Sequence, residues 1–121
     1  MELTSGHEIE VVEFLNSRKV KILENIEDKT GEVVNWYLER YGQTAQILLA
    51  MEELGELVSG LNQYFFRNKI SADQLSKEIA DVEIMMQSLR VIVGNDLVDF
   101  QKEKQIEKMV KFKEESEKKL I

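Results

Sequence analysis

Residues 75–93, LSKEIADVEIMMQSLRVIV, decide how this chain folds. At about 100° per residue, a helix gathers their apolar side chains on one face, namely Leu75, Val82, Met85, Leu89, Ile92 and Val93. Glu78 projects from the middle of that face, Asp81 lies one step to its side, and Lys77 points away from it. Because a carboxylate buried alone is strongly unfavourable, Glu78 needs a partner, and a cation shared with other carboxylates would supply one.

The composition of the 121-residue chain predicts an all-α fold. Proline is absent, glycine occurs six times and charged residues make up 32%, which together favour long helices over strands or disorder. The length is that of one domain, residues 1–121. Cysteine is absent as well, which excludes disulfides and thiolate metal sites.

Helical periodicity predicts helices over residues 8–28, 32–41, 43–67, 75–93 and 97–118. Lys29-Thr30-Gly31 is expected to separate the first two, and Gly42 either separates the next two or lies within one continuous helix. Ser71 and Gln74 match a capping box that starts the helix carrying Glu78. Residues 94–96, Gly-Asn-Asp, are expected to end that helix and to cap the last one.

The predicted helix over residues 43–67 has two different sides. One side forms a wide apolar face, made of Ile47, Ala50, Met51, Leu54, Leu57, Val58, Leu61 and Phe65. Wide apolar faces on this helix and on residues 75–93 favour a bundle completed by a second copy, as a homodimer or a dimer of dimers. Glu52, Glu53 and Glu56 fall on the other side, which Leu49 and Gly60 share, an unusual composition for a face that meets only water.

The spacing of the acids suggests a metal site. Residues three apart share a helix face, so Glu53 with Glu56, and Glu78 with Asp81, each point in one direction. Two such helices packed antiparallel would surround one point with four carboxylates. Oxygen ligands suit Mg²⁺, with Mn²⁺ as a substitute, whereas a di-iron centre would want histidines that these helices lack. The alternative for each acid pair alone is a solvated surface.

The two acidic motifs together carry a family resemblance. Met51-Glu52-Glu53-Leu54-Gly55-Glu56-Leu57, followed by Lys77-Glu78-Ile79-Ala80-Asp81-Val82, resembles the all-α MazG-type nucleotide pyrophosphohydrolases, whose pattern is Glu-Glu-x-x-Glu, a spacer and Glu-x-x-Asp. The resemblance covers about residues 42–111. Residues 1–30 lie outside it and are expected to be an N-terminal helical elaboration of a MazG-like bundle with a four-helix core.

The resemblance implies Mg²⁺-dependent hydrolysis of an NTP or dNTP between its α and β phosphates, yielding NMP and pyrophosphate. By position, Glu53, Glu56, Glu78 and Asp81 match the metal ligands. Glu52 and Glu53, the leading acids of the first motif, are the candidate catalytic residues, and Glu52 would orient water or a second ion, or else sit in solvent.

Four further residues are candidates for substrate binding. Lys104 and Lys108, on the last predicted helix, lie where relatives carry basic residues for the phosphates; otherwise they are ordinary solvated lysines. Trp36 and Tyr37 precede the first motif, in the region where relatives place aromatics against the base; otherwise they are core residues.

Charge and hydropathy narrow the remaining function classes. A net charge of −7 argues against nucleic acid as the partner. No apolar run reaches the roughly 20 residues of a membrane span, and no signal peptide opens the chain, so a cytoplasmic protein is expected. Two alternatives stay open, a non-catalytic helical oligomerisation or adaptor module and a phosphoribosyl-ATP pyrophosphatase-like enzyme.

Overall fold

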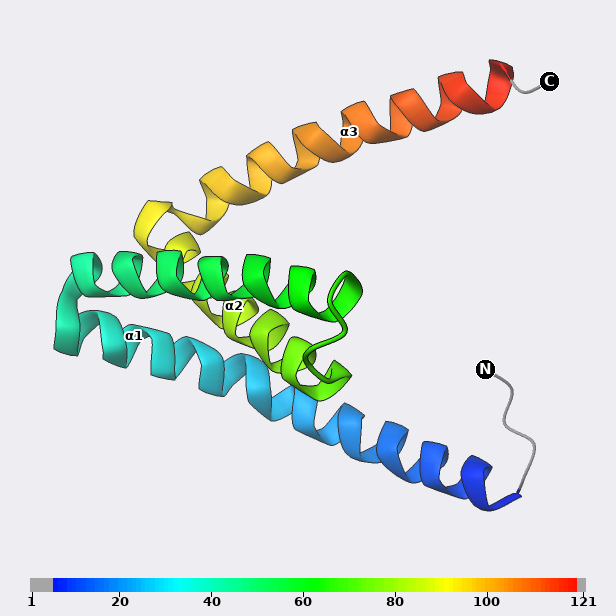
Figure 1. The fold of residues 1–121 in the computed structure, drawn as a ribbon. Coiled ribbons are helices and arrows are strands. Elements are labelled where there is room, and N and C mark those ends of the chain that lie inside the picture. Colours follow the sequence, from blue (N-terminus) through cyan, green and yellow to red (C-terminus); the bar gives the residue numbers. More distant parts are fainter. Residues whose placement is uncertain (1–5, 120–121) are drawn as a thin grey trace.

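The computed structural model describes the backbone of residues 6–119 and the side chains of residues 29–119. This part of the chain contains three helices and no strand, α1 (Gly6–Phe65), α2 (Ala72–Val93) and α3 (Asn95–Lys119) (Figure 1). The predicted all-α fold class is confirmed. The predicted helix over residues 8–28 is part of α1, and its amphipathic side chains lie outside the described ones.

Gly42 divides α1 into two arms that double back on each other (Figure 1). Its φ of 85° and ψ of 167° are not helical, and a positive φ is open to glycine because glycine has no Cβ. The first arm comprises residues 6–41 and the second arm residues 43–65. Of the two roles predicted for Gly42, the structure therefore shows the separating one.

The predicted break at Lys29-Thr30-Gly31 is wrong, because the first arm continues through these residues as a helix. A Cβ placed on Gly31 would have nothing within 4 Å, so no close approach of another element requires glycine there. Glycine within a helix costs only about 1 kcal/mol relative to alanine, which is too little to end a helix by itself.

Local hydrogen bonds define both ends of α2. The predicted capping box is confirmed, since Ser71 Oγ accepts from the Gln74 backbone N–H at 3.2 Å and Gln74 Oε1 accepts from that of Ser71 at 3.1 Å. At the other end the Gly94 N–H donates to the Arg90 carbonyl at 2.8 Å. Arg90 also forms an ion pair with Asp99 of α3 at 2.7 Å, which fixes the start of α3 against the end of α2.

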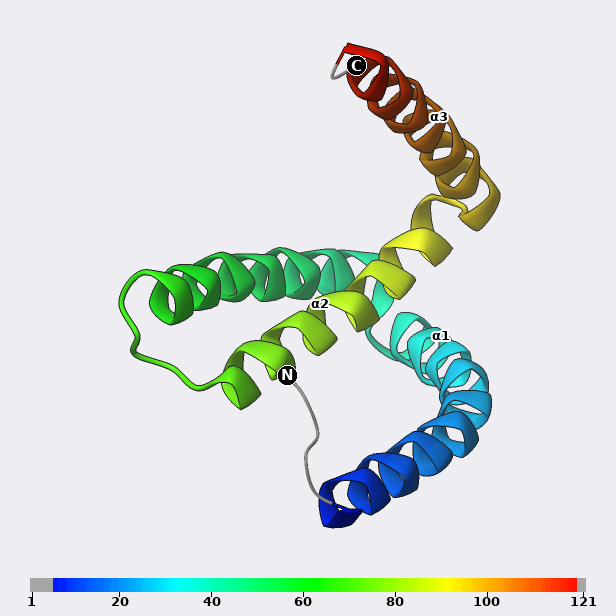
Figure 2. The ribbon, with the colours of Figure 1, turned by 90° about the vertical axis from the view of Figure 1, so that its right-hand side faces the viewer.

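The core lies where α2 packs against both arms of α1 (Figure 2). Among the described residues its buried apolar side chains are Val34, Ala50, Leu75 and Val82. Leu75 and Val82 belong to the predicted apolar face of α2, which is thereby confirmed at these positions, whereas Val93 at the end of that face is 61% exposed.

The second arm packs with the boundary between its predicted apolar face and its acidic side, where Ala50 and Gly60 are buried and Glu53 and Leu57 half-buried. On the apolar face only Ala50 is fully buried, and Met51, Val58 and Phe65 are 63 to 70% exposed. Gly60 allows a close approach of α2 at this boundary, because a Cβ on it would lie 3.5 Å from Glu78 Cγ. Most of the predicted apolar face of the second arm is therefore left uncovered by α2.

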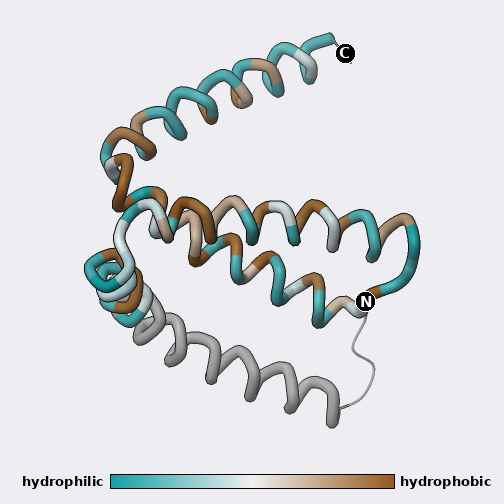
Figure 3. Tube along the Cα trace, turned by 60° about the vertical axis from the view of Figure 1, so that its left-hand side comes forward, coloured by the Kyte–Doolittle hydropathy of each residue, from teal (hydrophilic) through white to brown (hydrophobic). Residues whose placement is uncertain are grey.

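Helix α3 projects away from α1 and α2 (Figures 1 and 2). Within the described residues no Cα of α3 comes within 8 Å of one in α1. Figure 3 shows α3 as a largely hydrophilic helix with separate hydrophobic residues, and these side chains are exposed, Phe112 to 72%. Between residues 6 and 119 no helix combines the length and apolar composition that crossing a membrane requires.

Candidate metal centre

Three carboxylates meet where the second arm of α1 packs against α2. Glu53 comes from α1, and Glu78 and Asp81, one helical turn apart, come from α2. One oxygen from each of the three side chains lies within 4.8 Å of the others, and all three residues are partly buried. The structure thus brings together three of the four predicted metal ligands.

Two oxygens of this acidic group have no partner. Glu53 Oε2 and Glu78 Oε2 are both shielded from solvent and accept no hydrogen bond from any described residue. Buried polar atoms in folded proteins are normally paired, and buried charges are paired or coordinate metals. The two oxygens therefore have the property expected of ligand atoms for a hard cation.

Lys77 offsets part of the negative charge. Its Nζ lies 3.0 Å from Asp81 Oδ2, with the lysine side chain 71% exposed, so Lys77 reaches the acidic group from outside the apolar face. Three carboxylates and one ammonium leave two net negative charges, which a divalent cation would balance.

The electrostatic environment of Glu53 disfavours its charged form. Burial raises the pKa of the Glu53 carboxyl above its usual 4.5, and repulsion from the Glu56 and Asp81 carboxylates raises it further. A bound cation would reverse this effect, because it stabilises the ionised carboxylate.

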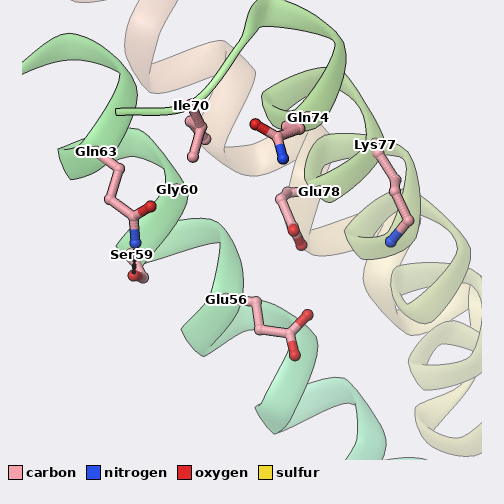
Figure 4. Close-up of a pocket in the computed structure, with 8 residues that line it drawn as sticks. All are labelled: Glu56, Ser59, Gly60, Gln63, Ile70, Gln74, Lys77 and Glu78. Atoms are coloured by element: carbon pink, nitrogen blue, oxygen red, sulfur yellow. Dashed lines mark hydrogen bonds between the residues drawn. The ribbon is translucent and has the colours of Figure 1, made fainter. Parts of the chain in front are cut away.

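The fourth predicted ligand, Glu56, lies beside the acidic group and not within it. It is exposed and, with Glu78, lines a cavity of about 430 Å³ toward the end of the second arm. Figure 4 shows Glu56 and Glu78 projecting from opposite helices into this cavity, with Gln63 and Gln74 farther along. Glu52 is also exposed and is not part of the three-acid group.

Trp36 and Tyr37 lie on the first arm as an exposed pair with Tyr41. The Trp36 and Tyr37 rings meet edge to face at 4.9 Å between centroids and are 51% and 41% exposed, so neither is a core residue of the isolated chain. Tyr37 borders a second cavity, of about 300 Å³, whose walls include Leu49, Met85, Gln46 and Ser88.

The sequence analysis missed Gln46 and Ser88, which are only 3% and 1% exposed. A usable signal was present in the spacing: Gln46 lies seven residues before Glu53, and Ser88 seven residues after Asp81. Seven residues are about two helical turns, so each polar side chain shares a helix face with one of the acids.

Lys104 and Lys108 are not brought to the acidic group within one chain. Both lie on α3, which does not approach α1 in the described structure. Lys104 Nζ sits 4.8 Å from the centre of the Phe100 ring, and both lysines line a shallow cavity with Glu107 and Lys111. Their predicted contact with phosphates would therefore require α3 of another copy.

The three-acid group is chemically suited to bind hard divalent cations, because these cations prefer oxygen ligands.

Comparison of the chain with models of known protein families, with curated proteins and with solved structures found no match.

Proposed function

We propose that the chain is a divalent-cation-dependent nucleoside triphosphate pyrophosphohydrolase, with Mg²⁺ as the ion and Mn²⁺ as a substitute. The observation that carries the proposal is the pair of shielded, unpartnered oxygens of Glu53 and Glu78, with an Asp81 oxygen close to both. An exposed surface cluster would solvate these oxygens; here they are held out of water at a helix contact.

The resemblance to the MazG-type pattern supports the same function. Glu53, Glu78 and Asp81 are three of the four positions at which the two motifs match family ligands, and these three acids lie together. Glu56 would complete the set by a rotation of its exposed side chain toward the ion.

The reaction would add water across the bond between the α-phosphorus and the bridging oxygen, releasing NMP and pyrophosphate. A bound Mg²⁺ would supply neutralisation of phosphate charge and acidification of water. Glu53, Glu78 and Asp81 would hold that ion, with Glu56 as a further ligand, and we assign orientation of the attacking water to Glu52. Lys77 would keep the Asp81 carboxylate in place through their ion pair.

Product analysis tests the reaction class. The protein is incubated with Mg²⁺ and a panel of NTPs, dNTPs and phosphoribosyl-ATP, and the products are separated by ion exchange. NMP and pyrophosphate are expected in equal amounts. Accumulation of NDP and phosphate, or no hydrolysis of any substrate, would refute the proposal, and cleavage of phosphoribosyl-ATP alone would favour that enzyme class.

An adaptor role is the second candidate, and the exposed apolar side chains of α1 and α3 favour it. Met51, Val58 and Phe112 are 63 to 72% exposed in the isolated chain, and large exposed apolar surfaces mark association sites. Both functions include association with another chain, so association does not distinguish them. Metal binding by the three acids does. An adaptor gains no stability from Mg²⁺ or Mn²⁺, whereas a metal-binding enzyme does.

A further inference from the structure

Two cavities lie along the contact between α1 and α2, one on each side of the three-acid group. From Glu53 toward Gly42 the same face of α1 carries Leu49 and Gln46, and from Asp81 toward Gly94 the same face of α2 carries Met85 and Ser88. These four residues line the 300 Å³ cavity beside the first arm. The 430 Å³ cavity in Figure 4 lies on the other side of the acids, beyond Glu56 and Glu78.

The 300 Å³ cavity is apolar with two polar groups set into its wall. Its apolar lining residues are Val33, Val34, Leu49, Ile84 and Met85, together with the ring of Tyr37. Ser88 is 1% exposed, and its Oγ has no hydrogen-bond partner among the described residues. Gln46 is 3% exposed. Apolar walls with a few convergent polar groups are typical of small-molecule sites, which start at about 300 Å³.

A buried hydroxyl without a partner is unfavourable, because it has lost its hydrogen bonds to water. A ligand that supplies the missing partner would recover that loss. The ligand must be flat or slender enough for the cavity, apolar over most of its surface and polar at one edge. A nucleobase has these properties, and proteins read bases by contacts to their polar edge and apolar packing on their faces.

We propose that this cavity, called the base cavity from here on, receives the nucleobase of the substrate, with Gln46 and Ser88 as its specificity-determining residues. The proposal rests on the proposed function. The Gln46 amide presents a donor and an acceptor side by side, which matches the adjacent donor and acceptor on a base edge. The Ser88 hydroxyl would supply a third hydrogen bond, and Tyr37 also lines the cavity.

The spacing along the helices agrees with this placement. Gln46 and Glu53 are seven residues apart, or about 10 Å at 1.5 Å per residue, which leaves room for a ribose and the α-phosphate between base and metal site. The β and γ phosphates would then extend toward the cavity lined by Gln63 and Gln74. The proposal therefore gives the substrate one orientation along the contact of α1 with α2, with its base toward Gln46 and its terminal phosphates toward Gln63.

Binding of nucleosides tests the base cavity without the phosphates. Uridine, cytidine, adenosine and guanosine are titrated into the metal-free protein, with the indole N–H resonance of Trp36, the only tryptophan, as the probe. The Trp36 ring contacts that of Tyr37, which borders the cavity. We expect one nucleoside to bind more tightly than the others, and Gln46→Leu and Ser88→Ala each to weaken it about three- to tenfold.

Gln43→Leu and Ser76→Ala are the matched controls, because both positions are exposed on the same two helices and neither lines the cavity. These variants should bind as the wild type does. Thermal unfolding of each variant identifies any that fails to fold, and Ser88→Ala, which removes one unpartnered oxygen, keeps the test available if Gln46→Leu does not fold. Unchanged nucleoside affinity and base preference in both cavity variants would overturn the assignment.

The same variants separate the two proposals. If the wild type releases pyrophosphate and Glu78→Gln does not, but Gln46→Leu and Ser88→Ala keep the wild-type KM and base preference, the base cavity is wrong and the proposed function stands. If nucleosides bind through Gln46 and Ser88 but no triphosphate is hydrolysed, the cavity stands and the reaction is wrong.

Discussion

Glu53 of α1 and Glu78 of α2 approach each other across the helix contact, and each has a carboxylate oxygen that is shielded from solvent and unpaired. Close carboxylates destabilise a metal-free protein through both repulsion and desolvation. Such an arrangement persists in a folded protein when something else repays its cost. For this chain we infer that a divalent cation does so.

Metal binding should therefore raise the melting temperature, and Glu78→Gln should reduce that rise. Mg²⁺ or Mn²⁺ at about 100 times its Kd would stabilise the wild type by about 2.7 kcal/mol. Glu78→Gln removes one charge at nearly constant shape, so its metal-free stability should be equal or higher, its response to metal smaller and its hydrolysis lost. Thermal unfolding with and without the ion measures the first two effects.

Glu83→Gln is the matched control, because Glu83 lies on the same helix, is exposed and stands outside the three-acid group. It should keep both metal response and activity. If Glu78→Gln behaves like Glu83→Gln in both assays, Glu78 does not bind a metal.

Stability of the metal-free protein should depend on the ionisation of Glu53. The pKa of Glu53 is raised in the folded state, so the folded protein binds the proton more tightly than the unfolded chain does. The ionised carboxylate therefore destabilises the fold above the folded-state pKa, and this loss is relieved as the pH falls toward the ordinary value of 4.5. Denaturant unfolding in EDTA across this range should show a smaller relief in Glu53→Gln than in the wild type. Parallel profiles for the two proteins would contradict the prediction.

The sequence predicted those features that depend on residues within a few positions of one another in the chain. The capping box of Ser71 and Gln74 is a contact over three residues, and the burial of Leu75 and Val82 follows from helical periodicity. The acids Glu53, Glu78 and Asp81 could be foreseen as a group because one of them interrupts an apolar face.

Helical periodicity could not predict which face of the second arm packs against α2. It shows that Met51 and Val58 share one face and Glu53 and Gly60 another, but not which face meets α2. Gly60 allows the close approach at the boundary of the two faces, and that approach becomes visible only with both helices in place. Gln46 and Ser88 were missed because uncharged polar residues carry no motif of their own, and only their seven-residue spacing from the acids places them on the same helix faces.

Gly42 and Gly31 should respond in opposite ways to alanine. Gly42 has a φ of 85° and a ψ of 167° at the turn between the arms, a backbone region essentially restricted to glycine, in which a Cβ costs about 1–3 kcal/mol. Gly31 is helical with open space around it, so Gly31→Ala should stabilise by about 0.5–1 kcal/mol. Denaturant unfolding of the two variants measures both changes. Equal effects would mean that the arms are not joined by a turn at Gly42.

The last prediction is that the protein associates through the apolar face that the second arm leaves uncovered. Val58 is 70% exposed and Met51 63%, and burying such side chains against another copy would stabilise a dimer or a dimer of dimers. Size exclusion with light scattering should give at least twice the chain mass of 14.1 kDa. Val58→Lys places a charge in that contact and should shift the protein toward the monomer. Ala80→Lys, at an exposed position on α2, makes the same charge change outside the proposed contact and should leave the mass unchanged. A wild-type monomer at micromolar concentration would exclude this contact, and with it any delivery of Lys104 and Lys108 to the acids of a second copy.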